Sequence, residues 1–287
     1  MPPDGSAPSL ARHPRPIVFL SDYGLEDEFV GIVHRVVESI APAVRVIDLT
    51  HHIPPHDVRA GALTLWRCAP WLHDCVVLAV VDPGVGTSRR PVAIEVAGSG
   101  TVLVGPDNSL LLPSAHALGR ITSAVRLDPQ DPGPNHPPGS GRTFDGRDLF
   151  APVAARIASG DGTTEDVGQQ IDPAGLIGDP VPSPVSEEGG WVRCQVLWVD
   201  RFGNAQLNAK PAHLSHLGDS LMILTRPGTK PWQARLATAF ADLREGELGL
   251  VTDSYGLLAL VLNASPAAER VGIREGDTIL IGSSADG

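Results

Sequence analysis

The feature that most constrains the fold is an unbroken apolar run at residues 76–81 (VVLAVV), which ends at Asp82. A strand that is apolar at every position is covered on both faces, as in a parallel sheet between two layers of helices. A similar short apolar run lies at residues 17–20, residues 44–49 are expected to form a second buried strand, and the apolar positions after Asp27 follow a helical period. This alternation predicts an α/β fold whose N-terminal domain is Rossmann-like, with a mainly parallel sheet and helices.

The loops that follow the predicted strands are the expected place for a site. In open α/β sheets, ligands bind beyond the carboxyl ends of the strands. Asp22, Asp82 and Asp107 each stand in a loop of this kind.

Two helices have clear end signals. Asp57 is placed to cap a helix that runs to about Cys68. Residues 148–159 are expected to form another helix, which Gly160 closes.

The pattern changes in the second half of the chain. Residues 179–190 are rich in Pro, Ser and Gly and are expected to form a linker. Beyond them, strand-like segments with turn residues between them predict a smaller all-β, barrel-like C-terminal domain. These segments are residues 191–199, 220–225, 248–252 and 257–262. The predicted division is a disordered tail at 1–15, an α/β domain at 16–178, a linker at 179–190 and a β domain at 191–287.

Charge and cysteine content argue against several function classes. The 287 residues have a formal net charge of -11, and the only lysines are Lys210 and Lys230, so a basic surface for nucleic acid is not expected. The three cysteines have no CxxC spacing, and no apolar run is long enough to cross a bilayer. The first residues lack the apolar segment of a signal peptide. We therefore expect a cytoplasmic protein without nucleic-acid or membrane partners.

The most informative loop for chemistry is residues 81–90 (VDPGVGTSRR). Its proline and glycines favour a tight turn, which would bring Asp82 close to Arg89, seven positions later. Spacing alone leaves open whether the two residues form a structural bridge or part of an active site. The position directly after a buried strand favours the second interpretation.

Two other segments also allow ordinary structural interpretations. In residues 141–148 (GRTFDGRD), Asp148 is placed to cap the following helix while the arginines pair with surface carboxylates. Residues 199–204 (VDRFGN) have the Gly-Asn pair of a simple turn. Neither segment on its own indicates a function.

Together, however, these segments resemble a known family. VVDPGVGTSRR, PDN, TFDGRDLFAP and DRFGN occur in the order found in the S-adenosylmethionine hydroxide adenosyltransferases, relatives of the fluorinase and chlorinase enzymes. The resemblance runs from about Pro16 to Gly276. It implies an enzyme in which water or hydroxide attacks the ribose C5′ carbon of S-adenosylmethionine and releases adenosine and methionine. It also implies no metal or redox cofactor, and a homotrimer with sites between subunits.

The resemblance assigns the catalytic positions. Asp82 and Arg89 match two members of an Asp-Arg-His set that holds the nucleophilic water. The third position departs from the pattern, because Asp145 stands where relatives have histidine. A second carboxylate would raise the pKa of one acid of the pair. His136, in the preceding loop, is an alternative substitute for the missing histidine.

The resemblance also assigns the substrate contacts. Asp22 matches the residue that binds the ribose hydroxyls, and His56 stands where the fluorinase has a tryptophan beside the ribose. The other matches are Asp27 and Asp200 near the methionine ammonium, Ser254 and Tyr255 near its carboxylate, Phe202 and Asn204 at the adenine, and Ala264 through its backbone.

Two alternative functions remain open at this stage. A halogenase would use the same substrate, but a carboxylate at position 82 would repel a halide ion. A sensor that binds S-adenosylmethionine or adenosine without turnover would fit the loss of the histidine at position 145.

Overall fold

The computed structural model describes residues 13–128, 141–178 and 181–284. The chain forms two compact units, Met1–Pro180 and Val181–Gly287, and each is described by itself. The expected linker at residues 179–190 contains β8 (Val185–Ser186), a short strand that pairs with the sheet of the second unit. His136, the alternative to the missing histidine, lies outside the described residues.

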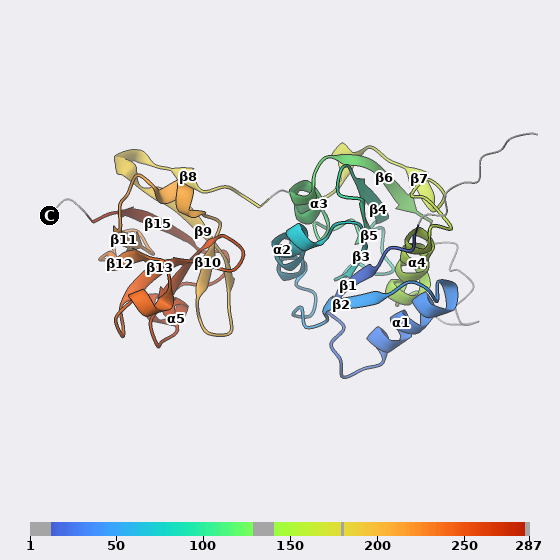
Figure 1. Ribbon diagram of the computed structural model, residues 1–287, viewed down its shortest axis with the longest axis horizontal. Helices are drawn as coiled ribbons and strands as arrows, with labels where there is room; N and C mark the ends of the chain where they lie inside the picture. The colour runs from blue at the N-terminus through green and yellow to red at the C-terminus, as the bar shows by residue number, and fades with distance from the viewer. Residues whose placement is uncertain (1–12, 129–140, 179–180, 285–287) are drawn as a thin grey trace, which may run out of the picture. The chain divides into compact units, whose positions relative to one another are not determined.

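The first unit is built on a seven-stranded sheet between helices (Figure 1). The strand order is β2-β1-β3-β5-β4-β6-β7. The strands are β1 (Ile17–Ser21), β2 (Val46–Thr50), β3 (Val76–Val80), β4 (Pro91–Val96), β5 (Thr101–Pro106), β6 (Ile121–Leu127) and β7 (Gly168–Gln170). The helices are α1 (Phe29–Ile40), α2 (Val58–Cys68), α3 (Leu112–Leu118) and α4 (Ala151–Ser159).

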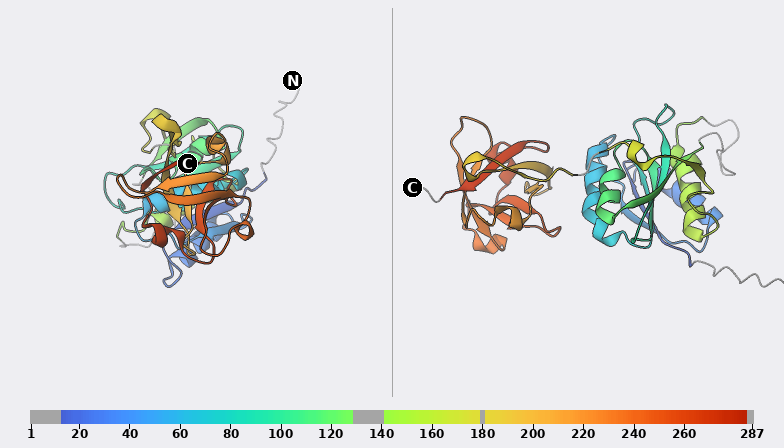
Figure 2. Two further views of the ribbon diagram at one scale, coloured as in Figure 1. Left: turned by 90° about the vertical axis from the view of Figure 1, so that its left-hand side faces the viewer. Right: turned by 90° about the horizontal axis from the view of Figure 1, so that it is seen from above.

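The helices cover both faces of this sheet. Helices α1 and α4 pack together on one face, and α2 and α3 pack together on the other, as the right-hand view of Figure 2 shows. Every residue of β1 and β3 is buried, as the continuous apolar runs predicted. The α/β class of the first unit is therefore confirmed.

The sheet is mixed, and only part of it is parallel. Strands β2, β1, β3 and β5 are parallel neighbours, whereas β4, β6 and β7 pair antiparallel. The prediction of a mainly parallel sheet overlooked the short link at residues 97–100 between β4 and β5. A link of this length joins antiparallel strands, because a parallel crossover needs a dozen residues or more. Gly98 and Gly100 make the turn with φ angles of 77° and 66°.

The cap at Asp57 and the helix end at Gly160 were predicted correctly, but the start at Asp148 was wrong, because Asp148 lies inside the first helical turn. Asp57 caps α2, with its Oδ1 accepting a hydrogen bond from the backbone N of Ala60 at 2.8 Å. The predicted helix at 148–159 consists of a π-helical turn at Gly146–Phe150 followed by α4, and Gly160 ends it in the left-handed conformation with φ 85°. The π turn begins directly after Asp145.

The second unit is a closed β-barrel, which confirms the barrel-like prediction. Seven strands follow one another in the ring β10-β14-β13-β12-β11-β15-β9, and β9 pairs back with β10. Their bounds are β9 (Val192–Val199), β10 (Ala205–Leu207), β11 (Ser220–Leu224), β12 (Trp232–Ala237), β13 (Leu248–Thr252), β14 (Leu258–Leu262) and β15 (Thr278–Ser283). A short helix, α5 (Ala267–Val271), packs against β14. Strands β10, β12 and β15 were not expected from the sequence.

No helix in the described ranges combines the length and the apolar character that a membrane span needs.

Candidate active site

Arg89 and Asp82 form a buried bidentate ion pair just beyond β3. Nε of Arg89 donates to Oδ1 of Asp82 at 3.0 Å, and Nη2 donates to Oδ2 at 2.5 Å. The two side chains are 8% and 5% exposed. Between them, Thr87 Oγ1 donates to the carbonyl of Gly84 at 2.7 Å, and Gly86 turns the chain with φ 74°. Two parallel hydrogen bonds fix both the distance and the orientation of the carboxylate.

Asp145 joins this pair from a distant segment. Nη2 of Arg89 also donates to Oδ2 of Asp145 at 2.6 Å. The Asp145 side chain is 17% exposed, and the guanidinium lies over the ring of Phe150, 5.3 Å from its centroid. One guanidinium therefore holds two carboxylates, and we call Asp82, Arg89 and Asp145 the Asp–Arg–Asp cluster.

The charge balance of the cluster favours proton uptake. Burial raises the pKa of Asp82, Arg89 opposes this rise, and the charge of Asp145 adds to it. A carboxyl group with a raised pKa is a stronger base than an ordinary one, so it suits the removal of a proton from a nucleophile.

Two residues of the PDN loop hold the segment that carries Asp82. Nδ2 of Asn108 donates to the carbonyl of Val81 at 2.9 Å, directly before Asp82. Asp107 is buried, pairs with Arg90, and accepts a hydrogen bond from the backbone N of Ile177 at 2.7 Å. Asp107, which the sequence placed among the candidate site loops, therefore supports the segment through this ion pair.

Two of the predicted substrate residues, Asp22 and His56, meet in the same unit. Oδ2 of Asp22 accepts a hydrogen bond from the backbone N of His56 at 2.8 Å. His56 has φ 66°, a left-handed conformation that is strained for a residue with a Cβ. The contact with Asp22 helps to hold this strained turn in place. Asp27 lies exposed in the loop that leads into α1.

A polar chain that the sequence did not reveal supports the Asp22 loop; Ser21 and His51 are buried in it, and Asp48 is exposed. Oγ of Ser21 lies 2.8 Å from Nδ1 of His51, and Nε2 of His51 lies 3.0 Å from Oδ1 of Asp48. His34 reaches the same oxygen at 2.8 Å. Burial raises the pKa of Asp48, but the hydrogen bonds from His51 and His34 outweigh it and leave the pKa below its ordinary value. A hydrogen-bonded chain of this kind cannot be predicted from sequence spacing, because its side chains come from separate elements.

In the barrel unit, Asp200 organises the turn after β9. Its Oδ1 accepts hydrogen bonds from the backbone N of Phe202 at 2.8 Å and of Asn204 at 2.9 Å, and its Oδ2 accepts one from Nδ2 of Asn204 at 2.8 Å. Gly203 packs against Pro266 so closely that a Cβ would overlap it. The turn leaves the Phe202 ring 67% exposed.

The other predicted residues of the barrel flank β14. Ser254 and Tyr255 are exposed in the turn before it, where Oδ1 of Asp253 accepts a hydrogen bond from the backbone N of Tyr255 at 2.8 Å. Ala264 follows β14 and has φ 66°, a left-handed conformation. The three residues therefore lie beyond opposite ends of one strand.

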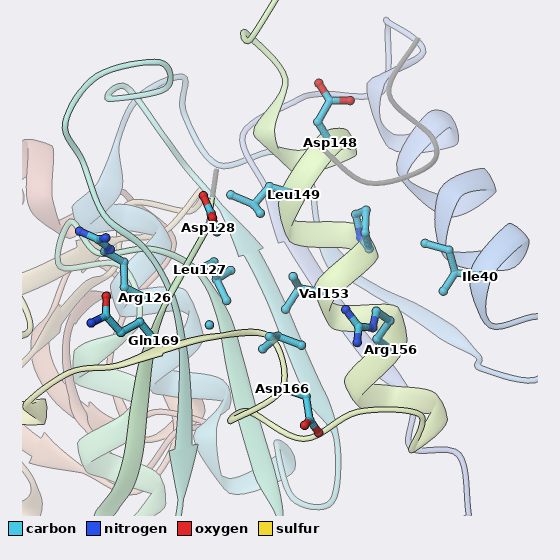
Figure 3. A pocket seen from close by; sticks show the side chains of 13 residues that line it. Ile40, Arg126, Leu127, Asp128, Asp148, Leu149, Val153, Arg156, Asp166 and Gln169 are labelled. Atoms are coloured by element: carbon cyan, nitrogen blue, oxygen red, sulfur yellow. The ribbon is translucent and has the colours of Figure 1, made fainter. Parts of the chain in front are cut away.

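A cavity of about 840 Å³ lies in the first unit beside α4, and Figure 3 shows its lining. Its charged side chains are of both signs, namely Arg126, Asp128, Asp148, Arg156 and Asp166. No member of the Asp–Arg–Asp cluster lines it. Among the described residues, no group of three or more His, Cys, Asp or Glu side chains is arranged to hold a metal ion.

Comparisons with known proteins show which family the chain belongs to. Residues 17–168 match the SAM hydroxide adenosyltransferase N-terminal domain, and residues 194–280 match the C-terminal domain of the same family. The chain is 44% identical over 266 residues to the (R)-S-adenosyl-L-methionine hydrolase of Salinispora tropica, which covers 92% of this chain and 97% of that protein.

More distant relatives match nearly the whole length of the chain. The fluorinase of an Actinoplanes species is 27% identical over 296 residues, covering 92% of this chain and 96% of that protein. A crystal structure of an uncharacterized conserved protein from Thermotoga maritima has a TM-score of 0.81 and 32% identity, covering 93% of this chain and 99% of that one. With both family domains matched in order around the motifs described above, the chain belongs to the SAM hydroxide adenosyltransferase family.

Proposed function

We propose that this protein hydrolyses S-adenosyl-L-methionine to adenosine and L-methionine. The observation that carries the proposal is the buried Asp–Arg–Asp cluster at the carboxyl end of β3. The hydrolases of this family, 44% identical over most of the chain, support the same reaction.

The proposed reaction is a single in-line displacement. The oxygen of water forms a bond to ribose C5′ while the C5′–S bond breaks, and the electron pair of that bond leaves with the sulfur of methionine. The sulfonium is a good leaving group, so the protein has mainly to align the water and exclude bulk solvent. Asp82 takes the proton that the water loses, and Arg89 keeps the carboxylate in place.

Asp145 takes the place of the family histidine in this proposal. Its charge raises the pKa of Asp82, and Arg89 binds both acids, so the two carboxyls act as a coupled pair. The pair is then able to accept one proton without a histidine.

The remaining predicted residues form the proposed substrate site. Asp22, fixed by the backbone of His56, is placed to bind the ribose hydroxyls. Asp27 and Asp200 are proposed for the methionine ammonium, Ser254 and Tyr255 for its carboxylate, Phe202 and Asn204 for adenine, and Ala264 for a backbone contact. The exposed ring of Phe202 supports its part in this proposal. As these residues come from both units, we also propose a homotrimer with sites between subunits, in the cytoplasm.

The form of the substrate is part of the proposal. The relative's name specifies the R epimer of S-adenosyl-L-methionine, so we propose that this protein prefers that epimer. We expect hydrolysis also in a buffer that contains halide ions, because the carboxylate of Asp82 would repel a halide ion.

The test is incubation of the purified protein with each epimer separately, followed by chromatography. Equal amounts of adenosine and methionine, formed faster from the R epimer, are the expected products. Tight binding of either epimer without any adenosine would favour a sensor, and 5′-chloro-5′-deoxyadenosine formed in chloride would favour a halogenase.

A further inference from the structure

Tyr23 stands beside the Asp–Arg–Asp cluster in a loop that is firmly held. Its backbone N donates to Oγ of Ser21 at 3.3 Å. The next residue, Gly24, has φ 69°, and its N donates to the carbonyl of His51 at 2.8 Å. The position of the Tyr23 backbone is therefore set by the same polar chain that supports Asp22.

Aromatic neighbours fix the direction of the Tyr23 ring. Phe19 lies at 6.4 Å and Phe144 at 5.5 Å between ring centroids, both edge-on, and Phe29 lies at 5.7 Å. A ring enclosed on several sides has few alternative rotamers. The hydroxyl group consequently has a defined place.

That place is against Gly146, the residue after Asp145. A Cβ at position 146 would overlap Oη of Tyr23 and would lie 3.1 Å from its Cζ. The glycine is thus required here by contact with the hydroxyl, at an ordinary helical backbone position. In the described part of the chain, no protein group forms a hydrogen bond with this hydroxyl.

The electrostatic surroundings keep the phenol protonated. Burial raises the pKa of Tyr23 well above its ordinary value, and the charges of Asp22, Asp82 and Asp145 raise it further. A phenol that stays neutral near neutral pH keeps its proton and is able to donate a hydrogen bond.

We infer that Tyr23 is a further catalytic residue, whose hydroxyl donates a hydrogen bond to the oxygen of the attacking water. This inference rests on the proposed function. Asp82 accepts one proton of the water and Tyr23 occupies one lone pair, so the other lone pair is left to attack C5′. Tyr23 keeps its own proton throughout, and its hydrogen bond stabilises the hydroxide character that the oxygen gains as Asp82 takes the proton.

The first test is Tyr23→Phe, which removes only the hydroxyl. A hydrogen bond to a charged group is worth about a 10- to 100-fold change in rate, so we expect kcat to fall by about that factor while KM stays within about twofold. A structural role would instead lower the thermal midpoint or raise KM.

The second test uses the contact with Gly146. Gly146→Ala in the wild-type background should displace the hydroxyl and lower kcat at least as much as Tyr23→Phe does. In the Tyr23→Phe background the overlapping oxygen is gone, and only the tight contacts of the new Cβ with Cζ of residue 23 at 3.1 Å and Cε2 of Phe144 at 3.2 Å remain. The same alanine should therefore cause a smaller further loss than it does in the wild-type background. This non-additivity identifies the hydroxyl, and not the ring, as the group that acts.

The outcomes separate the inference from the function on which it rests. Wild-type protein that releases no adenosine from S-adenosylmethionine would overturn both. Active wild-type protein together with a Tyr23→Phe variant of unchanged kcat would overturn the role of Tyr23 alone, as would losses in the double variant that simply multiply.

Discussion

Nη2 of Arg89 donates to Oδ2 of Asp145 at 2.6 Å while the same guanidinium holds Asp82 in a bidentate pair. This contact brings a second carboxylate to the position at which the family resemblance led us to expect a histidine. The charge of Asp145 therefore affects the pH at which Asp82 is able to accept a proton. The pH dependence of the reaction measures this effect.

Asp145→Asn should shift the acid limb of the pH–rate profile to lower pH. Asp82 has to be ionised to accept a proton, so activity rises as the pH passes through its pKa. The charge of Asp145 raises that pKa, and removing the charge lowers it. The measurement is kcat/KM against pH for wild type, Asp145→Asn and Asp161→Asn, an exposed acid of the same unit that serves as the control. A profile for Asp145→Asn that overlays the wild type would refute the coupled pair.

Asn108→Ala should weaken both the fold and the site. It removes the hydrogen bond to the carbonyl of Val81 beside Asp82, at a cost of about 1–3 kcal/mol in the free energy of unfolding, and it should lower kcat. Asn208→Ala is the matched control, because Nδ2 of Asn208 makes a similar bond to the carbonyl of Pro182 in the barrel unit. Urea unfolding and steady-state kinetics of both variants check this. Equal effects of the two on kcat would contradict the positioning role of Asn108.

His56→Gly should give a more stable protein than His56→Ala. The backbone at position 56 has φ 66°, which glycine adopts freely and alanine does not, so the difference should be about 1 kcal/mol in the free energy of unfolding. Urea unfolding of the two variants measures it. If alanine proved equal or better, the strained turn held by Asp22 would not exist in solution.

Asp48→Asn should change how stability depends on pH. The pKa of Asp48 is lowered in the folded state, so its ionised form contributes stability above its unfolded value of about 3.8, and this contribution is lost as the pH falls through the lower folded value. The stability gap between wild type and Asp48→Asn should therefore be constant near neutral pH and narrow in acid. Denaturant unfolding at a series of pH values follows the gap, and a gap that widens in acid would contradict the ion pairs with His51 and His34.

The sequence correctly predicted the elements that depend on interactions between residues close together in the chain. The cap at Asp57, the left-handed end at Gly160 and the buried strand β3 each depend on neighbouring residues, and each was read correctly. The antiparallel pairing of β4 and β5 could also have been predicted from the sequence, because the four residues between them are too few for a parallel crossover. By contrast, β15 is stabilised by β11 and β9, which lie far from it along the chain, so its own composition gave a weak signal.

The contacts of the site likewise differ in how far they could be predicted from the sequence. The seven-residue spacing of Asp82 and Arg89 predicted that the two could meet, but it left a structural bridge and an active site equally open. The contact of Arg89 with Asp145 spans 56 positions, and its place came from resemblance to a family and not from spacing. The sequence did not indicate a role for Tyr23, because that role depends on the contact of its hydroxyl with Gly146, which only the fold creates.

The most direct test of the account is the rate of adenosine release from the R epimer of S-adenosylmethionine by wild type, Asp82→Asn and Asp161→Asn. Asparagine keeps the shape of the side chain but is not a base, and loss of a general base typically lowers the rate by about 100- to 10,000-fold. We expect a fall of that size in kcat for Asp82→Asn, an unchanged thermal midpoint within a few degrees, and wild-type activity for the exposed control. An Asp82→Asn variant that still released adenosine at the wild-type rate would contradict the assignment of Asp82 as the base.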